Sequence, residues 1–144
     1  MNPVVAVERA MVAIRRRQTR RALARHMPID PAVFGVLDAV DERGPASVTE
    51  LAPALGVDQP RASRLVARAV DEGFLVRQAD QRDGRRALVA LTPKGRRQVD
   101  AAHQARQRIF AKAMADWSAE ERSTFARLLT SFVERLDSED MVNQ

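Results

Sequence analysis

Residues 47–96 read SVTELAPALGVDQPRASRLVARAVDEGFLVRQADQRDGRRALVALTPKGR, and the order of helix and turn signals in this stretch decides the fold. Ser47 and Glu50 form a capping box, which predicts the start of a short helix. Gly56 and Asp58 then end this helix and cap the next one almost immediately. So short a connection between two helices predicts a helix-turn-helix.

The second helix of this pair is predicted to run from about Gln59 to Glu72 and to be strongly amphipathic. Its apolar side consists of Ala62, Leu65, Val66, Ala69 and Val70. Its opposite side carries Gln59, Arg61, Ser63, Arg64 and Arg68. A helix with one buried side and several hydrogen-bond donors close together on the other is suited to bind a polar partner.

Two short strands are predicted after this helix, at residues 74–79 and 87–91. The polar segment between them contains Asp83 followed by Gly84, which predicts a hairpin with a basic tip. Two strands alone are marginally stable in water, so the hairpin is expected to pack on the preceding helices. Pro53 interrupts the short helix before the turn and predicts that this helix is short or distorted.

Helices are also predicted upstream of the helix-turn-helix. Apolar residues recur at helical spacing from residue 4 into an arginine-rich stretch that reaches residue 25, and Pro28 ends this helix. Asp30 and Pro31 then provide a cap and a proline in the first turn, so a second helix is expected to begin there and to end at Gly44.

Downstream, Thr92 and Pro93 predict the start of a long helix by the same reasoning. Ser118 and Glu121 form another capping box for a last helix. Its apolar stripe is the most regular in the chain and consists of Phe125, Leu128, Leu129, Phe132, Val133 and Leu136. Beyond Asp137 the sequence is polar, and we expect the tail to fray.

Composition excludes several classes of function. The chain of 144 residues has no cysteine, so disulfides, thiolate zinc sites and catalytic thiols are excluded. His26 and His103 are expected to be ordinary surface or interface residues, and we expect no metal site and no cofactor. No phosphate-binding glycine loop, nucleophile elbow or HExxH motif is present, so no enzyme activity is expected. No apolar stretch is long enough to span a bilayer, and no secretory signal is visible, which predicts a cytoplasmic protein.

The net charge of +5 is unevenly distributed along the chain. Residues 1–26 and 58–97 are strongly basic, whereas residues 27–57 and 98–144 are acidic. Such segregation favours a molecule with one cationic face, as expected of a protein that binds nucleic acid. Basic proteins without this function are common, so the charge supports the interpretation without establishing it.

The stretch 47–96 resembles the MarR (multiple antibiotic resistance regulator) family of bacterial transcription regulators. The resemblance is sharpest in the hairpin, where Asp-x-Arg-Asp-Gly-Arg at 80–85 precedes Leu-Thr-Pro-Lys-Gly at 91–95. Ser-Arg-Leu-Val at 63–66 and Glu-Gly-Phe-Leu-Val at 72–76 also match. The sequence departs from the family pattern at Pro53 and at Arg61, where small or hydroxyl residues are frequent.

The resemblance implies a mainly α fold with a small β-hairpin wing, in which a winged helix-turn-helix is flanked by dimerisation helices. The expected organisation is one domain over residues 1–144. In it, the DNA-binding lobe spans 30–96, the dimerisation helices span 1–26 and 98–138, and residues 139–144 form an unstructured tail. The expected activity is transcription regulation by a homodimer, most simply a repressor, on a pseudo-palindromic double-stranded DNA site.

DNA contacts are expected from two elements. On the recognition helix they are Gln59, Pro60, Arg61, Ser63, Arg64 and Arg68. Gln59 and Arg61 are candidates for reading base edges, with phosphate contact alone as the alternative for Arg61. Ser63, Arg64 and Arg68 are expected to bind the DNA backbone, which sets register without carrying sequence information.

On the wing, the expected contacts come from Arg82, Asp83, Arg85 and Arg86. Arg85, near the hairpin tip, is expected to enter the minor groove. Asp83 opposes DNA binding by charge, so we expect it to orient the Arg85 guanidinium. Arg82 and Arg86 are expected to contact phosphates.

The sequence leaves open both an effector and an alternative function. The resemblance implies that a small organic effector can bind and shift the spacing of two DNA-reading lobes, but the sequence identifies no ligand. The alternative function is a winged helix used for protein interaction, or an architectural DNA-binding protein without an effector. A protein-interaction module is expected to lack the basic wing and polar recognition face that this sequence carries.

Overall fold

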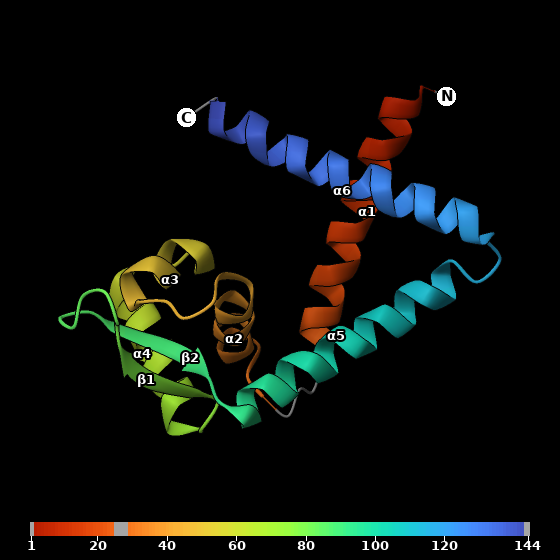
Figure 1. The fold of residues 1–144 in the computed structure, drawn as a ribbon. Helices are drawn as coiled ribbons and strands as arrows, with labels where there is room; N and C mark the ends of the chain where they lie inside the picture. Colours follow the sequence, from red (N-terminus) through yellow and green to blue (C-terminus); the bar gives the residue numbers. More distant parts are fainter. Residues whose placement is uncertain (1, 25–28, 143–144) are drawn as a thin grey trace. The chain divides into compact units, whose positions relative to one another are not determined.

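The computed structural model describes residues 2–24 and 29–142, and over them it confirms a mainly helical fold with a two-stranded hairpin (Figure 1). The elements follow in the order α1 (Pro3–Ala24), α2 (Pro31–Arg43), α3 (Val48–Leu55), α4 (Gln59–Asp71), β1 (Leu75–Ala79), β2 (Ala87–Leu91), α5 (Pro93–Ala113) and α6 (Ala119–Val142). The chain divides into two compact units, Met1–Asp100 and Ala101–Gln144.

The helix starts predicted from capping residues are confirmed in the first unit. Asp30 caps α2, and its carboxylate accepts a hydrogen bond from the backbone N–H of Ala32 at 2.8 Å. Ser47 caps α3, and its hydroxyl accepts from the backbone N–H of Glu50 at 3.2 Å. These local hydrogen bonds satisfy N–H groups that lack a partner within the helix, so they locate the helix starts without long-range information.

Helix α3 is short, as Pro53 within it predicts. It ends at Gly56, which adopts the left-handed conformation with φ of 67°. The backbone N–H of Val57 donates to the carbonyl of Ala52 at 3.1 Å, which completes the helix end. Asp58 then caps α4 directly, so the predicted tight turn between the two helices is present.

The core of this unit lies between α2, α3, α4 and the hairpin. Its largest fully buried side chains are Val33, Val36, Leu37, Leu51, Leu75, Val66 and Val99. Val66 and the neighbouring Ala62 and Ala69 are the inner face of α4, each with 0% exposure. Burial of this face leaves the opposite face of α4 in solvent and prevents rotation of the helix about its axis.

Strands β1 and β2 form an antiparallel pair with the register Leu75↔Leu91 through Ala79↔Ala87. Leu75 and Val89 are each 2% exposed, so the hairpin packs on the helices as expected. Ala46 extends the pairing, because its N–H donates to the carbonyl of Val89 at 3.2 Å and its carbonyl accepts from the Val89 N–H at 2.8 Å. The sequence signals did not predict this bridge.

The start of α5 is attached to the end of α4 by a group of polar contacts. The Thr92 hydroxyl donates to the carbonyl of Gly73 at 2.6 Å, and Lys94 Nζ donates to the carbonyl of Glu72 at 2.9 Å. Lys94 also lies 4.8 Å from the centre of the Phe74 ring, a cation–π distance. The Thr-Pro-Lys-Gly sequence therefore both begins α5 and holds the C-terminal end of α4.

The second unit contains the rest of α5 and α6. At the start of α6, Glu121 and Ser118 form the predicted capping box, with hydrogen bonds of 2.9 and 3.1 Å in the two directions. Trp117 and Phe125 pack edge to face, with ring centres 5.1 Å apart. Among the described residues of this unit, the exposed large apolar side chains are Phe110, Trp117, Phe125, Leu128, Val133 and Leu136.

Helix α6 extends to Val142, so the prediction of an unstructured tail from residue 139 is wrong for residues 139–142. The segment after Asp137 contains no proline or glycine that would end a helix. The Ser138 hydroxyl donates to the carbonyl of Glu134 at 3.0 Å, a contact compatible with a continuing helix. Residues 143–144 lie outside the described residues.

Helix α1 carries an exposed apolar stripe that consists of Val4, Val7, Met11 and Ile14. The predicted helix end at Pro28 and the expectation for His26 both lie outside the described residues. None of the described helices has the length and apolar character needed to cross a bilayer.

Candidate nucleic-acid interface

Helix α4 places the predicted recognition residues on its solvent side. The exposed residues of this helix include Gln59, Pro60, Arg61, Ser63, Arg64 and Arg68. Since Ala62, Val66 and Ala69 are fully buried, the exposed set faces outward in a defined orientation. This arrangement is the one required of a helix that enters the major groove.

The N-terminal turn of α4 is held in place before any ligand binds. Asp58 Oδ1 accepts a hydrogen bond from the backbone N–H of Arg61 at 2.8 Å, so this N–H is already satisfied. The Gln59 amide nitrogen donates to the hydroxyl of Thr49 on α3 at 3.1 Å. Thr49 was not predicted as part of the site, because its proximity to Gln59 depends on how α3 and α4 pack.

Arg68 forms ion pairs with two carboxylates of the protein. Its guanidinium lies 3.0 Å from Asp30 Oδ2 at the start of α2 and 3.2 Å from Glu72 Oε1 at the end of α4. A hydrogen bond from the backbone N–H of Ala32 and one from Arg68 lower the pKa of Asp30. Arg68 therefore attaches the recognition helix to α2, a role that the sequence did not indicate.

The lowered pKa of Asp30 predicts acid sensitivity. The unfolded chain protonates this carboxyl at its ordinary pKa of about 3.9, whereas the folded protein keeps it ionised to lower pH. The stabilisation by the Asp30 contacts is thus fully present above the pKa of the unfolded chain. It is lost as the pH falls through the lower pKa that Asp30 has in the folded protein. In Asp30→Asn, which retains a good helix cap but not the ion pair, we expect a smaller loss of stability between pH 6 and pH 3 than in the wild type.

Urea unfolding followed by circular dichroism at the two pH values measures this difference. Glu121→Gln is the matched comparison, because hydrogen bonds from Ser118 also lower the pKa of Glu121, and Glu121 forms no ion pair with an arginine of the described residues. Equal acid destabilisation in Asp30→Asn and the wild type would show that the Asp30 contacts do not contribute.

The tip of the hairpin is organised by two aspartates. Asp80 Oδ1 accepts from the backbone N–H of Arg82 at 2.9 Å, and Asp83 Oδ1 accepts from the backbone N–H of Arg85 at 3.1 Å. Gly84 does not adopt a positive φ, so the turn is built on these side chains and not on a left-handed glycine. Asp83 thus orients the backbone of Arg85, whereas the sequence had suggested a contact with the Arg85 guanidinium.

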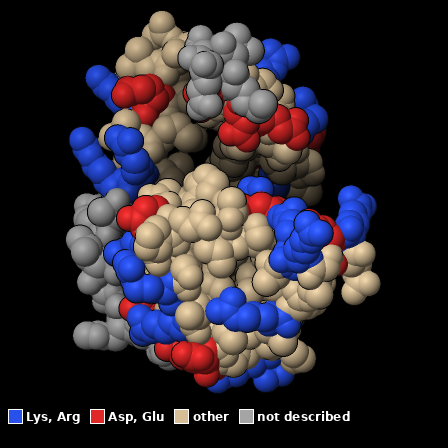
Figure 2. Space-filling model, turned by 90° about the vertical axis from the view of Figure 1, so that its left-hand side faces the viewer, with Lys and Arg blue, Asp and Glu red and all other residues tan. Residues whose placement is uncertain are grey.

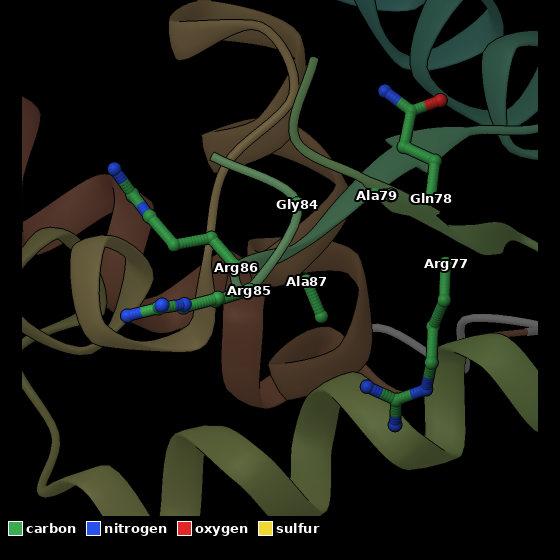
Figure 3. Close-up of a pocket in the computed structure, with 7 residues that line it drawn as sticks. All are labelled: Arg77, Gln78, Ala79, Gly84, Arg85, Arg86 and Ala87. Carbon is green, nitrogen blue, oxygen red and sulfur yellow. The ribbon is translucent and has the colours of Figure 1, made fainter. Parts of the chain in front are cut away.

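Arg85 and Arg86 extend from the hairpin on the same side, whereas Arg77 points toward α4 (Figure 3). These arginines and Gln78, Ala79, Gly84 and Ala87 line a shallow, open hollow on the wing. The sequence does not single out Arg77, because strand alternation does not indicate which positions at the edge of a small sheet stay exposed. Its exposed side chain adds a third cation to this surface.

Arg86 is also bound to the protein. Its guanidinium donates to the Ser47 hydroxyl at 3.2 Å and forms an ion pair with Glu50. A second nitrogen lies 3.9 Å from Asp80 Oδ2. The base of the hairpin is therefore connected to the first turn of α3.

The side of the molecule on which the hairpin tip lies carries several clusters of Lys and Arg side chains around an uncharged centre, with acidic groups between them (Figure 2). Arg61, Arg64, Arg82 and Arg85 form no side-chain ion pair within residues 2–24 and 29–142, so their charges are available to a ligand. A polar recognition helix beside a basic hairpin defines a winged helix-turn-helix with a DNA-binding surface.

Comparison with known proteins agrees with this description. A sequence model of the MarR family matches residues 27–86. YxaD of Bacillus subtilis, an uncharacterized HTH-type transcriptional regulator, is 29% identical over 130 residues, which cover 89% of this chain and 91% of YxaD. A MarR family protein from Bacillus stearothermophilus is 26% identical with a TM-score of 0.75, and the match covers 95% of this chain and 99% of that one.

A third similar protein is BpsR of Bordetella bronchiseptica, whose solved structure concerns the regulation of its DNA binding by 6-hydroxynicotinic acid. It is 25% identical with a TM-score of 0.53, and the match covers 86% of this chain and 98% of BpsR. The chain described here belongs to the MarR family of helix-turn-helix transcription regulators. It is a DNA-binding regulator, and its family is not one of enzymes.

Proposed function

We propose that this protein is a homodimeric repressor that binds a pseudo-palindromic operator. The observation that carries the proposal is the exposed polar face of α4, which burial of Ala62, Val66 and Ala69 holds outward beside the basic hairpin. In the complex, α4 lies in the major groove, with Gln59 and Arg61 at base edges. Ser63 and Arg64 contact the DNA backbone and set the register.

The wing supplies the second set of contacts in this proposal. Arg85, which has no ion-pair partner among the described residues, enters the minor groove, and Arg82 contacts a phosphate. The phosphate contacts expected of Arg68 and Arg86 stay predictions. A guanidinium has five N–H donors, so each of these arginines can bind a protein carboxylate and a phosphate together.

The exposed apolar side chains of α1 and α6 support the dimer. Val4 is 74% exposed and Leu128 is 54% exposed, and large apolar residues in such stripes are typical of surfaces that a partner covers. A two-fold dimer presents two copies of α4 about 34 Å apart, one turn of B-DNA. The operator is therefore expected to have two half-sites with this spacing.

We further propose that a small organic molecule releases the protein from DNA. The BpsR structure supports this part of the proposal, since 6-hydroxynicotinic acid regulates DNA binding by that protein. A ligand acts in this way only if it binds the DNA-free spacing of the two lobes more tightly than the DNA-bound one. The proposed place of action is the bacterial cytoplasm, on the nucleoid when the protein is bound to DNA.

Fluorescence anisotropy with the duplex that flanks the protein's own gene tests the proposed function. We expect tight binding with two chains per duplex, resistant to scrambled competitor and weakened steeply by salt. Arg85→Ala is expected to weaken binding by roughly tenfold, because the minor-groove contact is lost. A plot of the logarithm of the binding constant against the logarithm of the salt concentration should have a slope shallower by about 0.9 if that contact also neutralises one phosphate.

Arg108→Ala is the matched control for this variant. It removes an exposed arginine from the part of α5 in the second unit, outside the proposed DNA-binding lobe. Equal weakening by the two variants, with the dimer of each intact in size-exclusion chromatography, would mean that only net charge matters. Binding that is weak and indifferent to sequence would favour a protein-interaction or architectural role.

A further inference from the structure

One residue that contacts the wing is acidic. Glu50, in the first turn of α3, accepts a hydrogen bond from the Ser47 hydroxyl at 3.0 Å and forms an ion pair with Arg86 of the wing. Its side chain is 39% exposed, so solvent and an approaching phosphate group both sense its charge. The negative charge of this carboxylate repels DNA phosphates, so by electrostatics alone Glu50 opposes DNA binding.

Arg86 is the point at which the tip of the wing is connected to its strands. Its carbonyl accepts from the N–H of Asp80 at 3.0 Å, which closes the base of the loop. Its own N–H donates to the carbonyl of Asp83 at 3.0 Å. Arg85, the proposed minor-groove residue, is its immediate neighbour in the chain. A displacement of Arg86 therefore displaces Arg85.

The rest of the wing tip has little to hold it against the helices. Residues 81–87 are all exposed. Among the hydrogen bonds and ion pairs of the described residues, those that join segment 80–86 to a helix or its cap come from Arg86, to Ser47 and Glu50. The strands pack on the helices through Leu75 and Val89, but the exposed tip does not, so this contact has a large influence on the orientation of the tip.

We propose that Glu50 is a positioning residue for DNA binding, which acts through Arg86 to hold the wing at a set distance from α4. Thr49, the adjacent residue, contacts Gln59 at the start of α4. The first turn of α3 thus contacts both elements that are proposed to read DNA. The inference rests on the proposed function, because the orientation of the wing matters only if Arg85 binds DNA.

Glu50→Gln separates this role from simple electrostatics. Glutamine is also suited to the third position of a capping box, so the start of α3 is retained while the ion pair to Arg86 is lost. Glu121→Gln is the matched control, because Glu121 occupies the same position in the Ser118 capping box and has no arginine partner among the described residues. Both variants remove one negative charge.

In the anisotropy assay, Glu50→Gln is expected to bind the operator roughly threefold to fivefold more weakly than the wild type, the range expected from loss of an exposed ion pair. Glu121→Gln is expected to bind as the wild type does. The weakening by Arg85→Ala should shrink from roughly tenfold in the wild-type background to about threefold in the Glu50→Gln background, because the two residues act through one contact.

Tighter binding by Glu50→Gln, with a salt slope steeper by about 0.9, would overturn the inference. That result would mean that Glu50 restrains Arg86 from a phosphate. Equal binding by Glu50→Gln and the wild type, or an unchanged effect of Arg85→Ala, would also overturn it.

A measurement without DNA separates failure of this inference from failure of the proposed function. Backbone ¹⁵N relaxation of the free protein reports the mobility of residues 80–87 on the picosecond to nanosecond timescale. Glu50→Gln is expected to lower the order parameters of these residues, and Glu121→Gln is expected to leave them unchanged. Unchanged order parameters in Glu50→Gln would contradict the inference even if the wild type binds its operator. If the wild type fails to bind duplex DNA, the proposed function fails instead.

Discussion

Gly95→Ala is expected to lower the free energy of unfolding by about 3 kcal/mol, because a methyl group at this position has no space. An added Cβ would overlap the carbonyl oxygen of Phe74, and it would lie 3.0 Å from the carbonyl carbon. The Phe74 backbone has little freedom to move, since its N–H donates to the carbonyl of Ala69 at 3.0 Å. Its carbonyl accepts from the N–H of Thr92 at 3.0 Å.

Urea unfolding of the variant and the wild type measures this effect. Alanine is a better helix former than glycine by about 1 kcal/mol, so helix propensity alone predicts stabilisation at this position in α5. Gly84→Ala is the control, since a Cβ there would have no atom within 4 Å. A Gly95→Ala protein as stable as the wild type would mean that the attachment of α5 to the end of α4 is looser than described.

Arg61→Ala is expected to weaken binding to the operator by roughly tenfold to a hundredfold, the loss associated with one bidentate arginine–guanine contact. Arg61 follows Pro60 in the first turn of α4, its side chain is exposed, and its backbone is held by Asp58. Binding to unrelated duplex should change little, because base contacts add little to non-specific binding.

Arg64→Ala provides the comparison on the same helix. We expect it to weaken binding to operator and unrelated duplex by the same factor and to make the salt slope shallower by about 0.9, as loss of a phosphate contact predicts. Anisotropy titrations with both duplexes measure the ratio. If Arg61→Ala also weakens binding to both duplexes equally, Arg61 contacts phosphate only.

The helix starts and the hairpin were predictable because their signals are local. Asp30, Ser47 and Asp58 each cap a helix through hydrogen bonds to N–H groups no more than three residues away. The buried face of α4 and the exposure of its polar face followed from the spacing of small and apolar residues alone. The end of α6 was not predictable in the same way, since a polar segment after Asp137 is compatible with both a helix and a tail.

What the sequence determined by itself was therefore the order of elements, the face of α4 that meets solvent and the arginines that lie on it or on the wing. Only the tertiary structure decided which of these arginines are bound to the protein. Residues 58–97 contain many arginines of equal charge and reach, and no local rule distinguishes the two that pair with Asp30 and Glu50. The pairing depends on where packing brings α2 and α3, so it arises from long-range contacts that the spacing of residues does not encode.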